Sequence, residues 1–261
     1  MRRGFALGVV LLNELMFDAT LRAEGWGVLT ARFVYEGTPP KPPAVKITAD
    51  KEFCCKFNVV DESLVVNEQN GGIANVMVFL VVDRNAKKPP IHASYTAKED
   101  AEVRLDNDKC RYAPHVVVLR TSQTLVIGNR DAISHNTNFT TFLNPECNVL
   151  VPPGSEHKLM LKKEERRPLK VACNIHSWMS AWVVVTESPY AGVSDENGRL
   201  EIKNLPVGEW TFQAYHEKSG FVREVTQGGS PTKWNRGRLT AAVKPGQNDL
   251  GEIRIPASLF Q

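Results

Sequence analysis

Short apolar runs rich in β-branched residues recur along the chain and are separated by glycine, proline, asparagine and aspartate. Past residue 24, no stretch keeps a 3.6-residue apolar period over three turns, so the pattern does not favour long amphipathic helices. Short runs bounded by turn residues are typical of strands in a β-sandwich or barrel. The pattern predicts strands over residues 27–35, 63–66, 75–82, 115–120, 123–128, 159–161 and 182–186.

A second group of strands is predicted beyond a boundary near Ser188 and Pro189. Residues 195–198 (DENG) are typical of a hairpin turn, and the strands expected after it span residues 199–202, 209–216, 239–243 and 250–255. We therefore expect two domains, over residues 24–187 and 188–261. A unit of roughly 70 residues is only marginally stable alone, so the second domain is expected to pack on the first.

The N-terminus has the layout of a secretory signal. Arg2 and Arg3 precede a short apolar run over residues 4–12, which is too short for a stable membrane span. We expect residues 1–23 to be a signal peptide cleaved after Ala23, which would leave no stable membrane span in the mature form. The protein is then exported, to the periplasm or cell envelope of a bacterium.

Composition narrows the function class. The 261 residues carry 32 Lys+Arg against 29 Asp+Glu, a net charge of +3 that excludes a strongly basic, dedicated nucleic-acid binder. Disorder is not expected, because 42% of the residues are hydrophobic and only 23% are charged. Residues 162–167 (KKEERR) mix both signs and indicate a solvated loop, its acidic pair Glu164 and Glu165 included.

The five cysteines also constrain the fold. An odd number in an exported protein leaves at least one thiol unpaired or with another role. Cys54 and Cys55 are adjacent, and either could pair with Cys110, which would pin a long N-terminal loop to the sheet. The other two cysteines are Cys147 and Cys173.

One short loop concentrates metal-binding side chains. Cys173, His176 and Met179 follow one another at three-residue spacing between two predicted strands. Thiolate, imidazole and thioether together suit copper, whereas zinc has little use for a thioether. An electron-transfer copper site of this type needs a second histidine, and His135 lies just beyond the turn that follows a predicted strand.

The pattern N-x-D-x3-H-N over residues 129–136, followed at a distance by C-x2-H-x2-M, resembles the cupredoxins, the blue copper proteins that include plastocyanin and amicyanin. The resemblance is specific over residues 115–187, and the longer N-terminal part is similar to extended, planctomycete-like bacterial forms. It implies a Greek-key β-sandwich with one mononuclear copper. The ligands that it implies are His135, Cys173, His176 and Met179, with Asn136 as the residue that ties the two ligand segments together.

The second domain resembles a different family. Residues 195–210 follow the pattern D-x2-G-x-L-x-I-x2-L-x2-G-x-W, which is similar to the carboxypeptidase-regulatory-like β-sandwich. That resemblance implies a fold and says little about function.

These observations predict an all-β protein that transfers single electrons between redox protein partners and is not an enzyme. Electrons are expected to pass through the solvent edge of His176. Trp178 and Trp182, at the end of the ligand loop and just after it, would form an apolar docking face around this edge or cap the core. Two alternatives stay open: copper storage or delivery at the same residues, and a metal-free structural or binding β-sandwich of the cell envelope.

Overall fold

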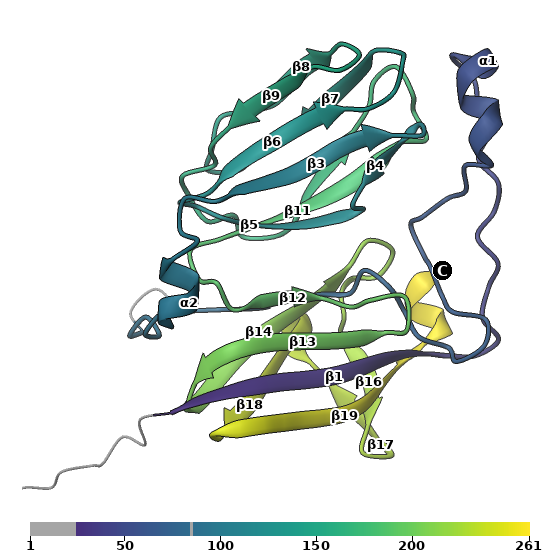
Figure 1. Ribbon diagram of the computed structural model, residues 1–261. Coiled ribbons are helices and arrows are strands. Elements are labelled where there is room, and N and C mark those ends of the chain that lie inside the picture. The colour runs from purple at the N-terminus through teal and green to yellow at the C-terminus, as the bar shows by residue number, and fades with distance from the viewer. Residues whose placement is uncertain (1–24, 84–85) are drawn as a thin grey trace, which may run out of the picture.

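A computed structural model describes residues 25–83 and 86–261. It confirms the all-β class, with two β-sandwiches stacked one above the other (Figure 1). The predicted signal peptide, residues 1–23, lies outside the described residues.

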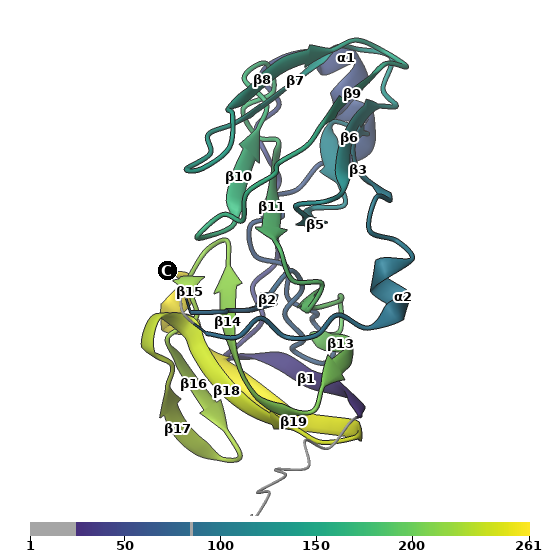
Figure 2. The same cartoon turned by 90° about the vertical axis from the view of Figure 1, so that its left-hand side faces the viewer.

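The upper sandwich consists of two facing sheets, seen edge-on in Figure 2. The five-stranded sheet has the order β5 (Val116–Arg120), β11 (Ser180–Thr186), β10 (Leu169–Ala172), β7 (His135–Phe139) and β8 (Cys147–Val151). The four-stranded sheet has the order β4 (Arg111–Ala113), β3 (Glu102–Asp108), β6 (Thr124–Asn129) and β9 (Glu156–Leu159). Alternate apolar side chains of both sheets meet in one core, among them Leu125, Val171 and Val183.

The lower sandwich also has two sheets. The first has the order β13 (Arg199–Pro206), β1 (Trp26–Glu36), β19 (Gly246–Pro256), β16 (Glu224–Gln227) and β17 (Ser230–Lys233). The second has the order β12 (Ala191–Val193), β2 (Met77–Leu80), β14 (Gly208–His216) and β15 (Gly220–Phe221), with β18 (Arg238–Val243) paired to β14. Their core includes Phe33, Leu80, Ile202 and Phe212.

In the part of the chain that the structure describes, helices are few and short. They are α1 (Lys51–Cys54), α2 (Ala93–Thr96) and the 3-10 turns η1 (Cys55–Phe57), η2 (Asn235–Gly237) and η3 (Ala257–Phe260). Within the described ranges, no helix combines the length and apolar character needed to cross a membrane.

The pairing of the first two strands differs from the predicted division at residue 188. β1 pairs antiparallel with β13 and parallel with β19, and β2 pairs with β12 and β14. Strands that were expected in the domain over residues 24–187 therefore complete the lower sandwich. Alternation of apolar and polar positions identifies a strand but not its partner, and these partners lie more than 100 residues away.

Several strand predictions also need correction. Residues 63–66 form only an isolated bridge at Val66, and the strand expected over 159–161 is displaced to Glu156–Leu159. Three strands next to the candidate site, β7, β8 and β10, were not predicted. Their sequences mix asparagine, lysine and apolar residues, so they lack a clear β-branched run.

The two sandwiches meet across an apolar cluster and an ion pair. Met77 and Phe79 of β2 pack with Trp182 and Val184 of β11. Beside them, Nε2 of His115 lies 2.8 Å from Oε2 of Glu217 in the loop after β14. The lower sandwich therefore packs directly on the sheet that contains the ligand loop.

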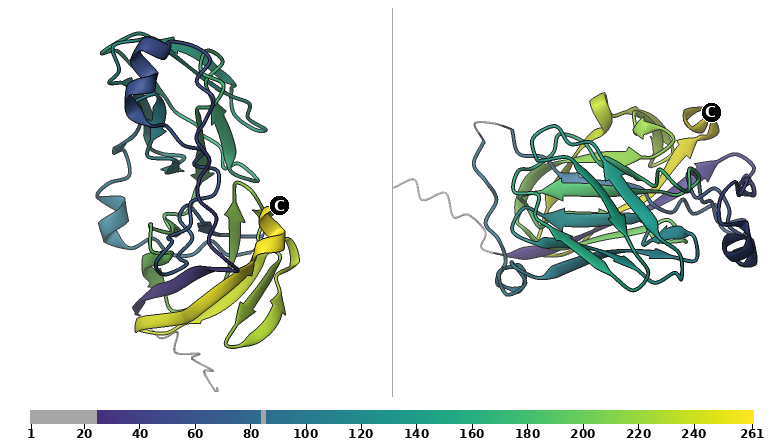
Figure 3. Two further views of the ribbon diagram at one scale, coloured as in Figure 1. Left: turned by 90° about the vertical axis from the view of Figure 1, so that its right-hand side faces the viewer. Right: turned by 90° about the horizontal axis from the view of Figure 1, so that it is seen from above.

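A long arm, residues 37–76, connects β1 to β2. It rises from the lower sandwich, reaches the upper one with α1 and η1 at its tip, and returns (Figure 3). Its two sides are joined by a bridge between Ala44 and Val60 and by a hydrogen bond from the N–H of Asp61 to the carbonyl of Pro43. The proline-rich stretch over residues 36–44 forms the end of β1 and the ascending side of this arm.

Candidate metal centre

Neighbouring strands position the predicted ligands. His135 is the first residue of β7, and Cys173 directly follows β10, which pairs with β7. Residues 173–179 form the turn between β10 and β11. Two backbone hydrogen bonds close this turn: Cys173 N–H to the carbonyl of Met179 (3.3 Å), and Met179 N–H to the carbonyl of His176 (2.8 Å).

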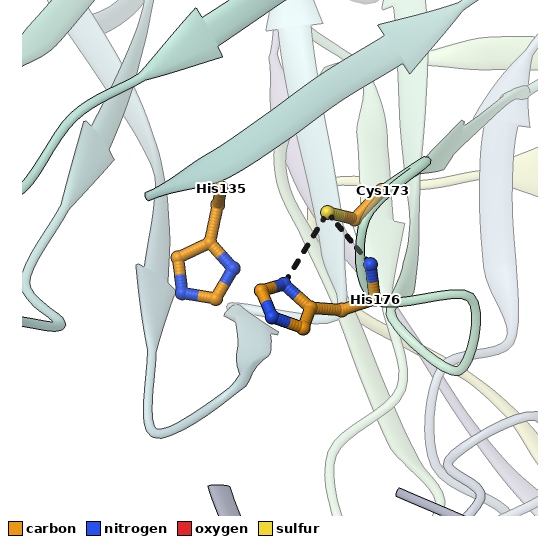
Figure 4. Close-up of side chains that lie close together, drawn as sticks. All are labelled: His135, Cys173 and His176. Carbon is orange, nitrogen blue, oxygen red and sulfur yellow. Dashed lines mark hydrogen bonds between the residues drawn. The ribbon is translucent and has the colours of Figure 1, made fainter. Parts of the chain in front are cut away.

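His135, Cys173 and His176 come together at the end of the upper sandwich (Figure 4). One potential ligand atom from each lies within 4.8 Å of the other two. The three side chains are buried, with 0%, 2% and 0% of their surfaces exposed, and the two imidazole centroids are 4.6 Å apart. Three donor atoms in so small a space surround a volume suited to one ion.

The Cys173 sulfur is surrounded by hydrogen-bond donors. Backbone N–H groups of Asn136 and His176 each donate to Sγ at 3.4 Å, and Nδ1 of His176 lies 3.6 Å from it. Burial raises the pKa of this thiol, but its interactions with the side chains of His135 and His176 and with these N–H groups outweigh burial. The pKa of Cys173 is lowered to about 6. The site therefore favours a thiolate, the form that binds metals.

An aspartate holds the far nitrogen of each imidazole. Nε2 of His135 lies 2.8 Å from Oδ2 of Asp131, and Nε2 of His176 lies 2.8 Å from Oδ2 of Asp50. When each Nε2 carries the proton, each Nδ1 presents a lone pair for a metal. The carboxylates thus orient both rings.

Asp131 is itself held in place. It accepts backbone hydrogen bonds from Lys109 (2.6 Å) and Cys110 (2.8 Å) in the turn between β3 and β4. Although burial raises the pKa of Asp131, the bonds from His135 and these N–H groups lower it below its usual value. Burial lowers the pKa of His135, but the interactions with Asp131 and Cys173 raise it by more than burial lowers it. The net shift of this pKa is therefore upward.

Asn136 connects the two ligand segments. Its Oδ1 accepts the N–H of Asn174 at 3.1 Å, and its Nδ2 donates to Oδ1 of Asn148 on β8 at 2.8 Å. These are the contacts expected of a side chain that ties the ligand loop to the strand of His135.

Met179 closes the ligand loop, and its side chain is buried in the same core cluster as Cys173. The donor cluster itself consists of His135, Cys173 and His176. The role of Met179 as a copper ligand stays a prediction.

Copper fits the residues present. Nδ1 of His135 is buried and has no hydrogen-bond partner among the described residues, which is costly unless a bound group satisfies it. One thiolate and two imidazoles, with a thioether in the same loop, match the donor preference of a mononuclear copper site. The cluster is compatible with such a site.

The expected solvent edge of His176 is not there. The side chain is fully buried, because Asp50 at the tip of the arm meets Nε2 and the ring of Trp178 lies 5.1 Å away, centroid to centroid. Trp178 donates from Nε1 to the carbonyl of Cys110, and Trp182 is buried between the sandwiches. Both tryptophans therefore pack against the core, which is the second of the two roles considered for them.

The cysteine alternatives are resolved. Cys54 and Cys110 form the disulfide, so the predicted link between the N-terminal loop and the sheet is confirmed with Cys54 as the partner. Cys55, Cys147 and Cys173 are free, and only Cys55 is exposed.

The acidic pair was wrongly predicted to be wholly solvated. Glu165 is only 5% exposed, and its carboxylate accepts hydrogen bonds from the backbone N–H groups of Phe142, Leu143 and Asn144. Its role is structural, because it anchors the loop between β7 and β8.

Sequence reasoning missed both aspartates. Asp131 was part of the N-x-D-x3-H-N pattern, and its position four residues before His135 could have suggested a contact. Asp50 carried no signal, since it lies 126 residues from His176 and reaches it only through the arm.

No family model matches the chain, and no curated protein matches it. Solved structures match parts of it. A copper-containing nitrite reductase from Thermus scotoductus SA-01 is 16% identical over 41% of this chain, with a TM-score of 0.30, and this chain spans only 25% of its length.

Two smaller proteins are similar to a comparable degree. A mutant of amicyanin in the reduced state is 18% identical, with a TM-score of 0.29, over 41% of this chain and 97% of its own. A purple cupredoxin from Nitrosopumilus maritimus is 20% identical, with a TM-score of 0.28, over 33% of this chain and 100% of its own. Likenesses this distant carry no argument about function, which depends on the side chains themselves.

Proposed function

We propose that this chain is an exported mononuclear copper protein that transfers single electrons. The observation that carries the proposal is the buried cluster of His135, Cys173 and His176, in which Nδ1 of His135 has no hydrogen-bond partner among the residues that the structure describes. A buried, unpaired nitrogen beside a thiol of lowered pKa is the arrangement that a thiophilic metal would stabilise.

The protein residues would hold the ion in a fixed geometry. Bound copper would supply one-electron chemistry by alternating between Cu(II) and Cu(I). His135 and Cys173 lie at the ends of paired strands, Asp131 and Asp50 fix the imidazole orientations, and Asn136 ties the ligand segments together. A site held this firmly changes little between oxidation states, which keeps electron transfer fast.

We propose a carrier rather than an enzyme, acting between redox proteins that are not yet identified. Burial of all three side chains supports this, because no donor of the cluster faces solvent where a substrate could reach it. Export is part of the proposal as well. The Cys54–Cys110 disulfide supports it, since disulfides persist mainly in oxidising compartments.

Substitution of Met179 tests the carrier function. In the copper-loaded protein we expect a reversible one-electron titration, and in Met179→Leu a retained copper whose potential is higher by about 60 mV or more, a tenfold change in the one-electron equilibrium. Loss of the Met179 thioether should disfavour Cu(II). Met160→Leu is the matched control, because Met160 is 42% exposed and belongs to neither the cluster nor its loop.

The outcomes separate the alternatives. An unchanged potential in Met179→Leu would remove Met179 from the ligand set. Loss of copper from that variant would favour storage or delivery over electron transfer.

A further inference from the structure

The tip of the arm lies directly on the candidate metal centre. Residues 50–57, which we name the cover, contain Asp50, α1 and η1. Asp50 meets Nε2 of His176 at 2.8 Å, although its own side chain is 42% exposed. The cover therefore separates His176 from solvent on the side where an exposed ring edge was expected.

Covalent and apolar contacts hold the cover in place. Cys54 of the cover is bonded to Cys110, and both are fully buried in a cluster that Phe53, Phe57 and Trp178 pack against. Cys110 is linked to the surroundings of both ligand histidines. Its N–H donates to Asp131, which holds the His135 ring. Its carbonyl accepts from Trp178, whose ring lies beside that of His176. The disulfide thus lies between Asp131 on the His135 side and Trp178 on the His176 side.

The rest of the arm restricts how far the cover can move. Its base is fixed by the bridges Val34–Gly72 and Val66–Ile73, and its middle by the bridge Ala44–Val60. The prolines at positions 39, 40, 42 and 43 stiffen the ascending side. Because the arm is anchored at its base and held at its tip by the disulfide, the residues at the tip stay in one position.

We propose that residues 50–57 seal the His176 edge of the metal centre, that the Cys54–Cys110 disulfide keeps this seal closed, and that the centre is thereby built to retain its metal. Only the retention of the metal rests on the proposed copper function. The seal itself concerns the apoprotein and can be tested without copper. A sealed edge favours a permanent electron-transfer ion over copper storage or delivery, because delivery requires a partner to reach the ligands.

Histidine acylation of the apoprotein by diethyl pyrocarbonate, mapped by mass spectrometry, tests the seal. In the wild-type protein we expect His176 to be protected, as buried His216 is, while half-buried His157 reacts. In Cys54→Ser/Cys110→Ser we expect His176 to react at least about tenfold faster, since a tenfold change in accessibility corresponds to only 1.4 kcal/mol of opening free energy. His157 and His216 serve as internal controls within each chain.

A second variant covers the case in which the untethered protein does not fold. Phe53→Ala/Phe57→Ala keeps the disulfide but removes the apolar contacts of the cover. Here we expect a smaller acceleration at His176 with His216 still protected. The seal is overturned if wild-type His176 reacts as fast as His157. It is equally overturned if His176 reacts at the wild-type rate in a folded variant that lacks the disulfide or the phenylalanines.

Copper retention is measured separately on the loaded protein. We expect an excess of a Cu(I) chelator to remove copper at least about tenfold faster from reduced Cys54→Ser/Cys110→Ser than from the reduced wild-type protein. Equal rates would refute the retention role. If the protein binds no copper but His176 is protected, the proposed function is refuted and the seal stands. If the protein binds copper but His176 of the apoprotein reacts, the seal is refuted and the proposed function stands.

Discussion

Asp131→Ala is expected to lower the free energy of unfolding of the apoprotein by about 3 kcal/mol and the affinity for copper by about 10- to 100-fold. The Asp131 carboxylate is buried and accepts from the N–H groups of Lys109 and Cys110 and from the His135 ring. Without it, two backbone donors lose their acceptor and the imidazole loses the group that fixes its tautomer. Urea unfolding followed by tryptophan fluorescence, and copper titration, measure the two effects.

Two variants control this prediction. Asp131→Asn keeps an oxygen acceptor and should lose less stability than the alanine variant. Asp108→Ala removes a carboxylate of the same β3–β4 hairpin for which no side-chain hydrogen bond is found within the described ranges, so it should change neither quantity. A stability loss below about 0.5 kcal/mol in Asp131→Ala would contradict this role, because such values are typical of surface substitutions.

The His115–Glu217 pair between the sandwiches is expected to make stability depend on pH. Burial lowers the pKa of His115, but Glu217 and Glu62 outweigh it and raise the pKa to about 9. Since the unfolded-state pKa is about 6.5, the stabilisation is complete below about pH 6.5 and is lost as pH rises through about 9. The shift corresponds to about 3 kcal/mol at most, and relaxation of the site would reduce it.

Glu217 sets the acid limit of the same interaction. Burial raises its pKa, but His115 and Lys170 lower it below 4.5, so its contribution is present above that value and lost as pH falls through the lowered pKa. The pair therefore stabilises the protein most between about pH 4.5 and 6.5.

Urea unfolding at several pH values checks this prediction. From about pH 6 to 10, the wild-type protein should lose about 1 to 3 kcal/mol more stability than His115→Gln. His157→Gln is the matched control, since His157 has no ion pair within the described parts of the chain, and it should follow the wild-type curve. Parallel curves for wild type and His115→Gln would remove the pair as a source of stability.

The sequence predicted the ligand cluster better than its surroundings, for a physical reason. Cys173 and His176 lie within one tight turn, so their spacing alone determines that they are close. His135 was proposed from its place after a predicted strand and from the resemblance, and its own strand was not predicted because β7 is rich in asparagine. In the structure the three side chains come close together because β7, which begins with His135, is paired with β10, which ends just before Cys173.

The exposure of His176 was wrongly predicted because it depends on a segment far away in the sequence. The arm places Asp50 and Cys54 on the ligand loop only after β1 and β2 have joined the lower sandwich. No local pattern encodes such a path. The same holds for the domain division, because a strand's alternation shows which face is buried and not which strand it joins.

The absorption spectrum of the purified protein after addition of Cu(II) tests the copper centre most directly. We expect an intense thiolate-to-Cu(II) band in red light that is absent in Cys173→Ser and retained in Cys147→Ser, in which a core thiol outside the cluster is replaced. A wild-type protein that shows no such band and retains no copper would contradict the account.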